Sequence, residues 1–417
     1  MTQLLKISCV LLGISFSLRL HTPIAFGLCV LFSFLIIIFE KRRRIYNWIL
    51  RPKERRLVFL LTILFFSFSL SSINSIEVFR SIPVISYLFI YMFFSYILFF
   101  FFRENNHALI ITCSFFLISV CFSAILVSSY NFLEYLSIPE WDIDEFGEKV
   151  SGADLWAGEV RRFKGFSNLL VLLICLCPFF EKKMGNKKNF FSYLLFPSII
   201  PIIYLGNVNS ATLGILSGVL AVIIFRLSMI CKKPKQKLII FAIFFFMVLG
   251  FIFNILVKQY ENNPITEINL MIPTSIVDAH RQIIWGFSLS EFKKNPILGI
   301  GPDSSNFIEG SQENIGHPST GNMNYIPSHP HNFLIELLLE TGLLGLLTFS
   351  SLILYVNYYV AKKSSAFNLN YLIFFNGYFW GASLVNFSFW ASWWQGSYFL
   401  ILAMMLSIIY DNRKKKC

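Results

Sequence analysis

The 417-residue sequence contains little charge and few histidines. Only 14% of its residues are charged and six are histidines, whereas soluble domains are about 25% charged. Hydrophobic residues make up 56% of the chain and include 48 phenylalanines. Apolar runs of about 17–25 residues, long enough to cross a bilayer as helices, recur from end to end. The composition therefore excludes a soluble domain and predicts an all-α polytopic integral membrane protein.

The cysteine and histidine positions predict neither disulfide bonds nor a metal site. All eight cysteines fall in predicted spans or in basic connections, so no disulfide framework is expected. A zinc site from His317, His329, His331 and Asp303 is conceivable, but no established ligand spacing is present. We therefore expect no metal and no cofactor.

Twelve membrane spans are predicted, and they make residues 1–417 a single transmembrane domain. The spans lie at approximately 4–18, 24–39, 57–73, 84–102, 108–128, 166–180, 189–205, 212–229, 238–257, 332–360, 369–386 and 391–410. Two connections are long, 129–165 and 258–330, and loops of this length are usually functional.

The distribution of basic residues predicts which side of the membrane each connection faces. Most of the 35 Lys and Arg residues lie in alternate connections and at the C-terminus, in segments such as "RPKERR", "EKKMGNKK" and "DNRKKKC". This asymmetry places those segments and both termini in the cytoplasm, and both long loops outside. The net charge of +12 therefore indicates topology and contact with anionic membrane lipids, with no nucleic acid as a partner.

The second long loop contains an amphipathic segment, 278–294. Its apolar side chains are expected to lie along the membrane surface, and Arg281 could stack on Trp285 four residues later. The apolar residues concerned are Ile283, Ile284, Phe287 and Phe292. An interfacial anchor without chemistry is the alternative reading of this segment.

The stretch "SHPHNFLIELLLETGLLGLL", residues 328–347, leads from that loop into a span. If a helix begins near His331, Gly342 and Gly345 lie near the same face, where they would let another helix approach. Glu336 and Glu340 then lie on the opposite face, with a structural role toward loop backbone or an arginine. His331 could act as a general base at the membrane mouth, or it could only cap the helix. His329 is interpreted as a loop residue.

Three segments resemble elements of the O-antigen ligase family, whose superfamily also includes O-antigen polymerases and protein O-oligosaccharyltransferases. The first resemblance is His331-Asn332 followed after nine residues by Gly342 and then by Gly345. "RRFKGFSN" is similar to an arginine-x-x-glycine element and points to Arg162 and Gly165. "HRQIIWGFSLSEFKKNPILGIG" is similar to a third element and points to Arg281, Trp285, Pro296, Gly299 and Gly301.

The resemblance implies a fold like that of the C-type glycosyltransferases and a reaction at the periplasmic face of the bacterial inner membrane. The donor would be an undecaprenyl diphosphate-linked glycan and the acceptor a sugar hydroxyl of the lipid A core. His331 would be the base, and Arg281 and Arg162 would stabilise the diphosphate leaving group without a metal and with inversion. Substrate-binding roles fall to Arg161, Lys164, Trp285 and Asn332.

Other functions stay open on the sequence. An O-antigen polymerase or a protein-glycosylating enzyme would share the same elements. A flippase or another transporter of lipid-linked glycans belongs to a different class, and transporters place ionisable or broken-helix sites near mid-membrane. The acids predicted inside spans here are Glu336 and Glu340, while the other polar candidates lie at the outer surface. This distribution favours a transferase.

The topology can be tested with reporter fusions after Lys258 and Lys363. Because the basic segments are expected to stay in the cytoplasm, the fusion after Lys258 should report an external location and the fusion after Lys363 a cytoplasmic one. A cytoplasmic signal after Lys258 would reverse the orientation.

Overall fold

The computed structural model describes most of the chain. The described residues are 1–49, 55–138, 141–143, 149–151, 162–185, 189–230, 254–258, 272–274, 277–316, 320, 323–361 and 366–411.

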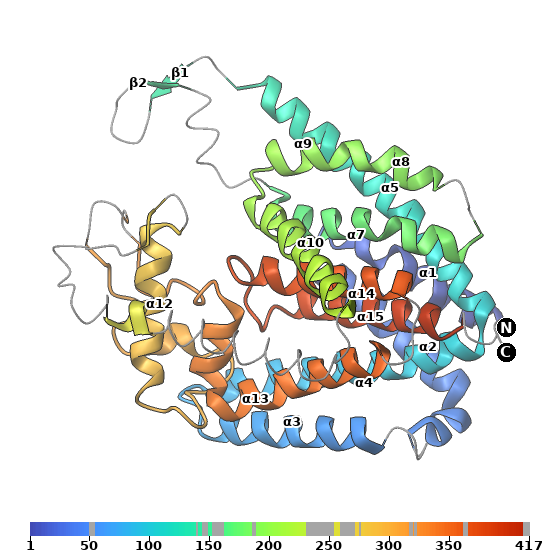
Figure 1. Cartoon of the computed structure of the whole chain (residues 1–417), viewed down its shortest axis with the longest axis horizontal. Helices are drawn as coiled ribbons and strands as arrows, with labels where there is room; N and C mark the ends of the chain where they lie inside the picture. Colours follow the sequence, from blue (N-terminus) through green and yellow to red (C-terminus); the bar gives the residue numbers. More distant parts are fainter. Residues whose placement is uncertain are drawn as a thin grey trace.

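Helices make up nearly all of the regular structure (Figure 1). They are α1 (Gln3–Leu18), α2 (Pro23–Ile49), α3 (Arg55–Ile73), α4 (Val78–Glu104), α5 (Asn106–Leu136), α7 (Lys164–Lys183), α8 (Phe190–Leu195), α9 (Ile199–Tyr204), α10 (Asn209–Ile230), α12 (Ala279–Phe292), α13 (Phe333–Ala361), α14 (Ala366–Ser383) and α15 (Ser392–Asp411). Two short 3-10 helices are η2 (Phe196–Ser198) and η3 (Ser305–Phe307). Strands β1 (Trp141–Ile143) and β2 (Lys149–Ser151) pair antiparallel, with Trp141 opposite Ser151.

The helical composition is that of a multi-pass membrane protein. Within the described residues, eight helices are long and apolar enough to cross a bilayer: α2, α3, α4, α5, α7, α10, α13 and α15. Helix α1 and the segment Phe190–Tyr204 are apolar but shorter. The expected number of twelve spans is not confirmed, and most of the predicted span 238–257 lies outside the described residues.

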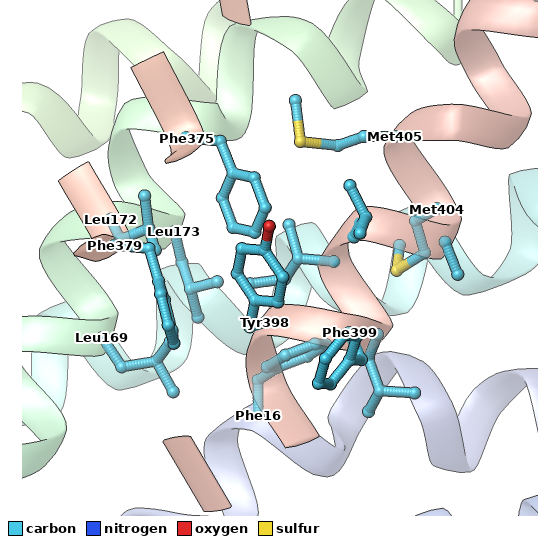
Figure 2. Packing of buried hydrophobic residues seen from close by; sticks show 14 of the residues in the cluster. Phe16, Leu169, Leu172, Leu173, Phe375, Phe379, Tyr398, Phe399, Met404 and Met405 are labelled. Carbon is cyan, nitrogen blue, oxygen red and sulfur yellow. The ribbon is translucent and has the colours of Figure 1, made fainter. Parts of the chain in front are cut away.

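One aromatic core joins helices from both ends of the sequence (Figure 2). Phe16 of α1, Leu169 of α7, Phe375 of α14 and Tyr398 of α15 all belong to this buried cluster. The rings of Phe375 and Tyr398 stack with centroids 5.0 Å apart. Between membrane helices, close packing of this kind supplies much of the association energy that water cannot drive.

At one end of the bundle, here called the histidine end, the polar connections meet. Helices α1, α3, α5 and α14 end there, and α2, α4, α7, α10, α13 and α15 begin there. The connections at this end bond to one another: Ser75 after α3 bonds to Ser304, and Arg80 in α4 pairs with Asp303 at 2.8 Å. His331, just before α13, bonds to Asn386 between α14 and α15.

Helix α13 is broken at Gly342. This glycine has φ +64° and ψ −172°, which no L side chain adopts without strain, so two helical segments meet there. The break leaves carbonyls before it and amides after it without partners in their own helix.

The segment 296–301, "PILGIG", fills the break. The amides of Leu343 and Leu344 donate to the carbonyls of Pro296 and Ile297 at 2.9 and 3.2 Å. In return, Ile300 and Gly301 donate to the carbonyls of Leu339 and Glu340 at 3.2 and 2.9 Å. The backbone groups exposed by the break are thus satisfied by a loop, which allows an irregular backbone inside an apolar bundle.

The expected role of the two glycines needs correction. A Cβ on Gly342 would lie 2.1 Å from the Ile297 carbonyl oxygen, so the element that approaches it is loop backbone and not a helix. Gly345 does face another helix, because a Cβ there would lie 3.1 Å from Phe68 of α3. The predicted stripe of His331, Gly342 and Gly345 on one continuous helix is therefore wrong. The helix begins at Phe333 and is interrupted at Gly342.

Gly342→Ala should destabilise the protein. Residues held in sparsely populated backbone regions cost about 1–3 kcal/mol each, and here the overlap with Ile297 adds to that strain. The measurement is thermal unfolding of the purified variant in detergent. Gly27→Ala is the control, because Gly27 lies within α2 and a Cβ there meets nothing within 4 Å. Equal melting temperatures for the two variants would contradict this interpretation.

Candidate functional site

His331 lies before α13, in the connection that leads into it. Its φ of +54° places it in the left-handed region, and α13 starts two residues later. Asn332 is the residue that caps the helix: its Oδ1 accepts from the amides of Leu334 and Ile335 at 3.1 and 3.3 Å. The reading of His331 as a helix cap is therefore wrong.

The backbone carbonyl of Asn386 accepts hydrogen bonds from two imidazoles. Nδ1 of His331 lies 3.1 Å and Nε2 of His329 2.9 Å from this oxygen, and the two ring centroids are 4.2 Å apart. A carbonyl oxygen can only accept, so both of these nitrogens carry hydrogen. In the neutral ring of His331, Nε2 is then the nitrogen with a free lone pair.

The surroundings keep His331 neutral. Burial, helped by the nearby His329, lowers the pKa of His331 to about 4, against the opposing effect of the hydrogen bond to Asn386. Arg281 also lowers this pKa through its charge, which places the arginine within electrostatic reach of the ring. Burial likewise lowers the pKa of His329. At neutral pH both imidazoles are unprotonated.

A polar network behind the histidines holds Asn386 in place. The Asn386 amide donates to Ser210 of α10 at 3.1 Å, and Asn168 of α7 donates to the same hydroxyl at 2.8 Å. Tyr378 of α14 donates to the Asn168 carbonyl at 2.9 Å. Oδ1 of Asn168 is buried and has no hydrogen-bond partner among the described residues. Three helices, α7, α10 and α14, therefore hold the acceptor that orients His331.

Glu336 and Glu340 each fasten a loop to α13. Glu336 accepts from the Ser388 hydroxyl at 2.5 Å and from the Phe389 amide at 2.6 Å. Glu340 accepts from the amides of Asp303 and Ser305, at 2.6 and 3.0 Å, and from the indole of Trp390. Both side chains are fully buried. Glu336 thus holds the loop that carries Asn386, and Glu340 holds the connection that follows Gly301.

Helix α12 exists close to its predicted bounds, but its orientation differs from the prediction. Ile284, Phe287 and Phe292 are buried in a second apolar cluster that includes Ile335 and Leu339 of α13. This face therefore packs on protein, and the expected arrangement along the membrane surface is wrong for these residues. Trp285 donates from its indole to the Pro330 carbonyl at 2.9 Å, which ties α12 to the residue just before His331.

Arg281 projects from the first turn of α12. Asp278 caps this helix by accepting from the Arg281 amide at 2.8 Å, and its carboxylate also pairs with the guanidinium. The Arg281 side chain is 38% exposed, although its Nε is buried and has no hydrogen-bond partner in the part of the chain that the structure describes. The ion pair with Asp278 takes the place of the predicted stacking on Trp285.

The other predicted cations lie at the start of α7. Arg162 is exposed, with its guanidinium 5.9 Å from the ring centroid of Tyr130 and 5.4 Å from that of Phe163. Lys164 is the first residue of α7. Arg161 lies outside the described residues, as does His317 of the zinc hypothesis. The structure brings Arg162 and Lys164 to the histidine end, at the start of α7, whereas Arg281 belongs to α12.

The sequence interpretation did not identify Asn386, Ser210 or Asn168. Each is a polar residue near the end of a predicted span, a position where hydrophilic residues are ordinary. Their shared function depends on helix pairing, because α7, α10 and α14 meet only in the folded bundle. No spacing along the chain could have grouped them.

Comparison with known proteins agrees with these observations. Residues 194–350 match the family model described as O-Antigen ligase. Proteins of Rickettsia typhi and Rickettsia prowazekii, both named "Putative polysaccharide ligase", are 31% and 30% identical over 235 residues. Each alignment covers 55% of this chain and 56% of the relative, so the chain spans about half the length of the curated relatives it matches.

The matched region extends from α8 to α13 and includes Arg281, the segment 296–301 and His331. The resemblance seen in the sequence is thus confirmed for the elements within residues 194–350, and over that region this multi-pass membrane protein is similar to the O-antigen ligase family.

Proposed function

We propose that the protein is a glycosyltransferase of the O-antigen ligase type. It transfers a glycan from undecaprenyl diphosphate to a sugar hydroxyl of the lipid A core, with inversion and without a metal. The reaction takes place at the periplasmic face of the bacterial inner membrane, and both termini lie in the cytoplasm.

The observation that carries this proposal is the geometry of His331. Its Nδ1–H is held by the Asn386 carbonyl, its ring is neutral at physiological pH, and its Nε2 has a free lone pair. A neutral imidazole with one nitrogen anchored and the other available is the arrangement that a general base requires.

In the proposed step, the acceptor hydroxyl oxygen attacks the anomeric carbon of the donor while its proton moves to Nε2 of His331. The bond between the anomeric carbon and the diphosphate oxygen breaks, and the electron pair leaves with undecaprenyl diphosphate. Attack on the face opposite the leaving group inverts the anomeric centre. The donor's glycosyl diphosphate bond supplies the energy, so no nucleotide is required.

Cations at the histidine end would stabilise the leaving group. Arg281 and Arg162 can bind phosphate oxygens through planar forks that stay charged, and Lys164 adds a further positive charge. An anionic diphosphate near His331 would also favour the imidazolium, and so raise the pKa of the base once the donor is bound.

The arrangement of the helices supports the proposed orientation. Helices α2, α7, α10, α13 and α15, which are followed in the sequence by basic segments, all end at the end of the bundle opposite His331. If those segments stay in the cytoplasm, the histidine end faces the periplasm.

His331→Asn should abolish most transfer while leaving the fold intact. Asparagine tolerates the left-handed backbone that His331 adopts, so the variant removes the base with little strain. Loss of a general base lowers turnover by about 100- to 10,000-fold. The measurement is in vitro transfer by purified protein, with lipid-linked donor and either lipid A core or a second lipid-linked glycan as acceptor.

His329→Asn is the matched control, because His329 shares the Asn386 acceptor but is interpreted as non-catalytic. Near-normal turnover in His331→Asn would exclude the base role. Preference for the second lipid-linked glycan as acceptor would indicate a polymerase. Loss of wild-type activity with EDTA would indicate a metal site.

Arg281→Ala should remove most activity, and Arg281→Lys should restore little of it. A lysine supplies a point charge but cannot reproduce a bidentate contact with phosphate oxygens. The quantity to compare is kcat/KM for the donor in the two variants and in the wild type. Full activity in Arg281→Lys would show that the site needs only positive charge at this position.

A further inference from the structure

Arg19 is a cation at the histidine end that the sequence interpretation did not single out. It follows directly after α1, in the segment "SLRLHTP". Its guanidinium is partly buried, and its Nε is shielded from solvent and has no hydrogen-bond partner among the described residues. Within the described part of the chain, no acidic side chain forms an ion pair with it. Burial lowers the pKa of Arg19 to about 10, so the charge persists at neutral pH but is incompletely solvated.

An indole ring supports this guanidinium. Cζ of Arg19 lies 3.9 Å from the ring centroid of Trp393 in α15, which is close enough for a strong cation–π contact. Stacking covers one face of the planar group and fixes its orientation. The edge that carries the N–H donors stays available for a bidentate partner such as a phosphate.

That edge approaches the start of α7. A Cβ on Gly165 would lie 3.9 Å from Nη2 of Arg19, so the guanidinium lies beside this glycine at van der Waals distance. Helix α7 begins after Phe163, whose side chain makes no capping hydrogen bond to the first turn. A helix N-terminus favours negative charge, and Arg162 and Lys164 lie beside it.

The packing explains why these three elements meet. Phe16 of α1, Leu169 of α7 and Tyr398 of α15 share the core shown in Figure 2. Arg19 lies three residues beyond Phe16, and Gly165 lies four residues before Leu169. The same helix contacts that build the core therefore bring the arginine, the glycine and the indole together at its end.

The position relative to His331 suits a leaving group. Trp393 packs against Phe387 with ring centroids 5.4 Å apart, and Phe387 follows Asn386, the acceptor of His331. Arg19 is thus linked to the base through the pair Trp393 and Phe387 and then through Asn386. In the proposed displacement, Nε2 of His331 hydrogen-bonds to the acceptor hydroxyl, and that hydroxyl oxygen is in near-attack contact with the anomeric carbon. Together the two contacts put Nε2 roughly 6 Å from the anomeric carbon. The diphosphate lies on the far side of that carbon. An arginine that binds the diphosphate should therefore not be in contact with His331.

We propose that Arg19, stacked on Trp393 beside Gly165, binds the diphosphate group of the lipid-linked donor. This inference rests on the proposed function and adds a binding residue outside the matched region 194–350. The competing explanation is that Arg19 only joins α1 to α15 through its cation–π contact.

The test measures the affinity of the purified full chain, in detergent, for undecaprenyl diphosphate that carries no glycan. The readout is the rise in melting temperature that the ligand causes. Arg19→Gln should weaken binding about 10- to 100-fold, the range expected for lost hydrogen bonds to a charged group. With glycan-loaded donor, KM should rise while kcat changes much less. Arg44→Gln is the control, because Arg44 is an exposed arginine at the other end of the bundle, paired with Glu104.

The outcomes separate the two proposals. Wild-type protein that neither binds undecaprenyl diphosphate nor transfers glycan would overturn the proposed function. Wild-type binding together with equal affinity in Arg19→Gln would overturn only the role of Arg19. A purely structural role would lower the melting temperature of the unliganded variant and leave its affinity unchanged. If Arg19→Gln does not fold, the same affinity is measured for Arg19→Lys. A several-fold weaker affinity for undecaprenyl diphosphate supports the proposal, and an unchanged affinity overturns it.

Discussion

The break in α13 at Gly342 is the constraint on which the histidine end depends. A broken helix inside an apolar bundle exposes backbone groups that water cannot reach, and each must find a partner in the protein. Segment 296–301 supplies four such partners through backbone hydrogen bonds. The same bonds fix where the connection between α12 and α13 enters the bundle. Without the break, segment 296–301 would lose these four partners.

Two buried carboxylates extend this arrangement to both sides of α13. Glu340 holds the residues after Gly301, and Glu336 holds the residues after Asn386. Each carboxylate accepts from backbone amides as well as side chains, so its burial is compensated by hydrogen bonds. Because both acids belong to one helix, the loop that follows segment 296–301 and the loop that carries Asn386 keep a fixed spacing. The position of the His331 ring follows from that spacing.

The sequence was sufficient for features governed by local rules. Long apolar runs predicted the membrane helices, and the amphipathic pattern around Arg281 predicted α12 to within a few residues. The motif around His331 led to the family that the comparisons confirm for residues 194–350.

Features that depend on distant contacts were missed. A glycine within a span reads equally well as a packing site or as a break, and only the approach of Ile297 to Gly342 decides between them. The apolar face of α12 fits a membrane surface as well as a protein surface, until Ile335 and Leu339 are seen against it. Arg19 looks like an ordinary residue at the end of a span, and its contact with Trp393 joins positions near opposite ends of the chain.

The shared carbonyl of Asn386 has a consequence for the turnover cycle. In hydrolytic triads, a carboxylate behind the histidine stabilises the imidazolium that forms during catalysis. Here Nδ1 of His331 donates to the neutral backbone oxygen of Asn386, which also accepts a hydrogen bond from His329. The imidazolium formed by an acquired proton would therefore be stabilised at Nδ1 by a neutral carbonyl oxygen and not by a carboxylate. The histidine would release the proton readily once the lipid diphosphate departs, and would be unprotonated again for the next acceptor.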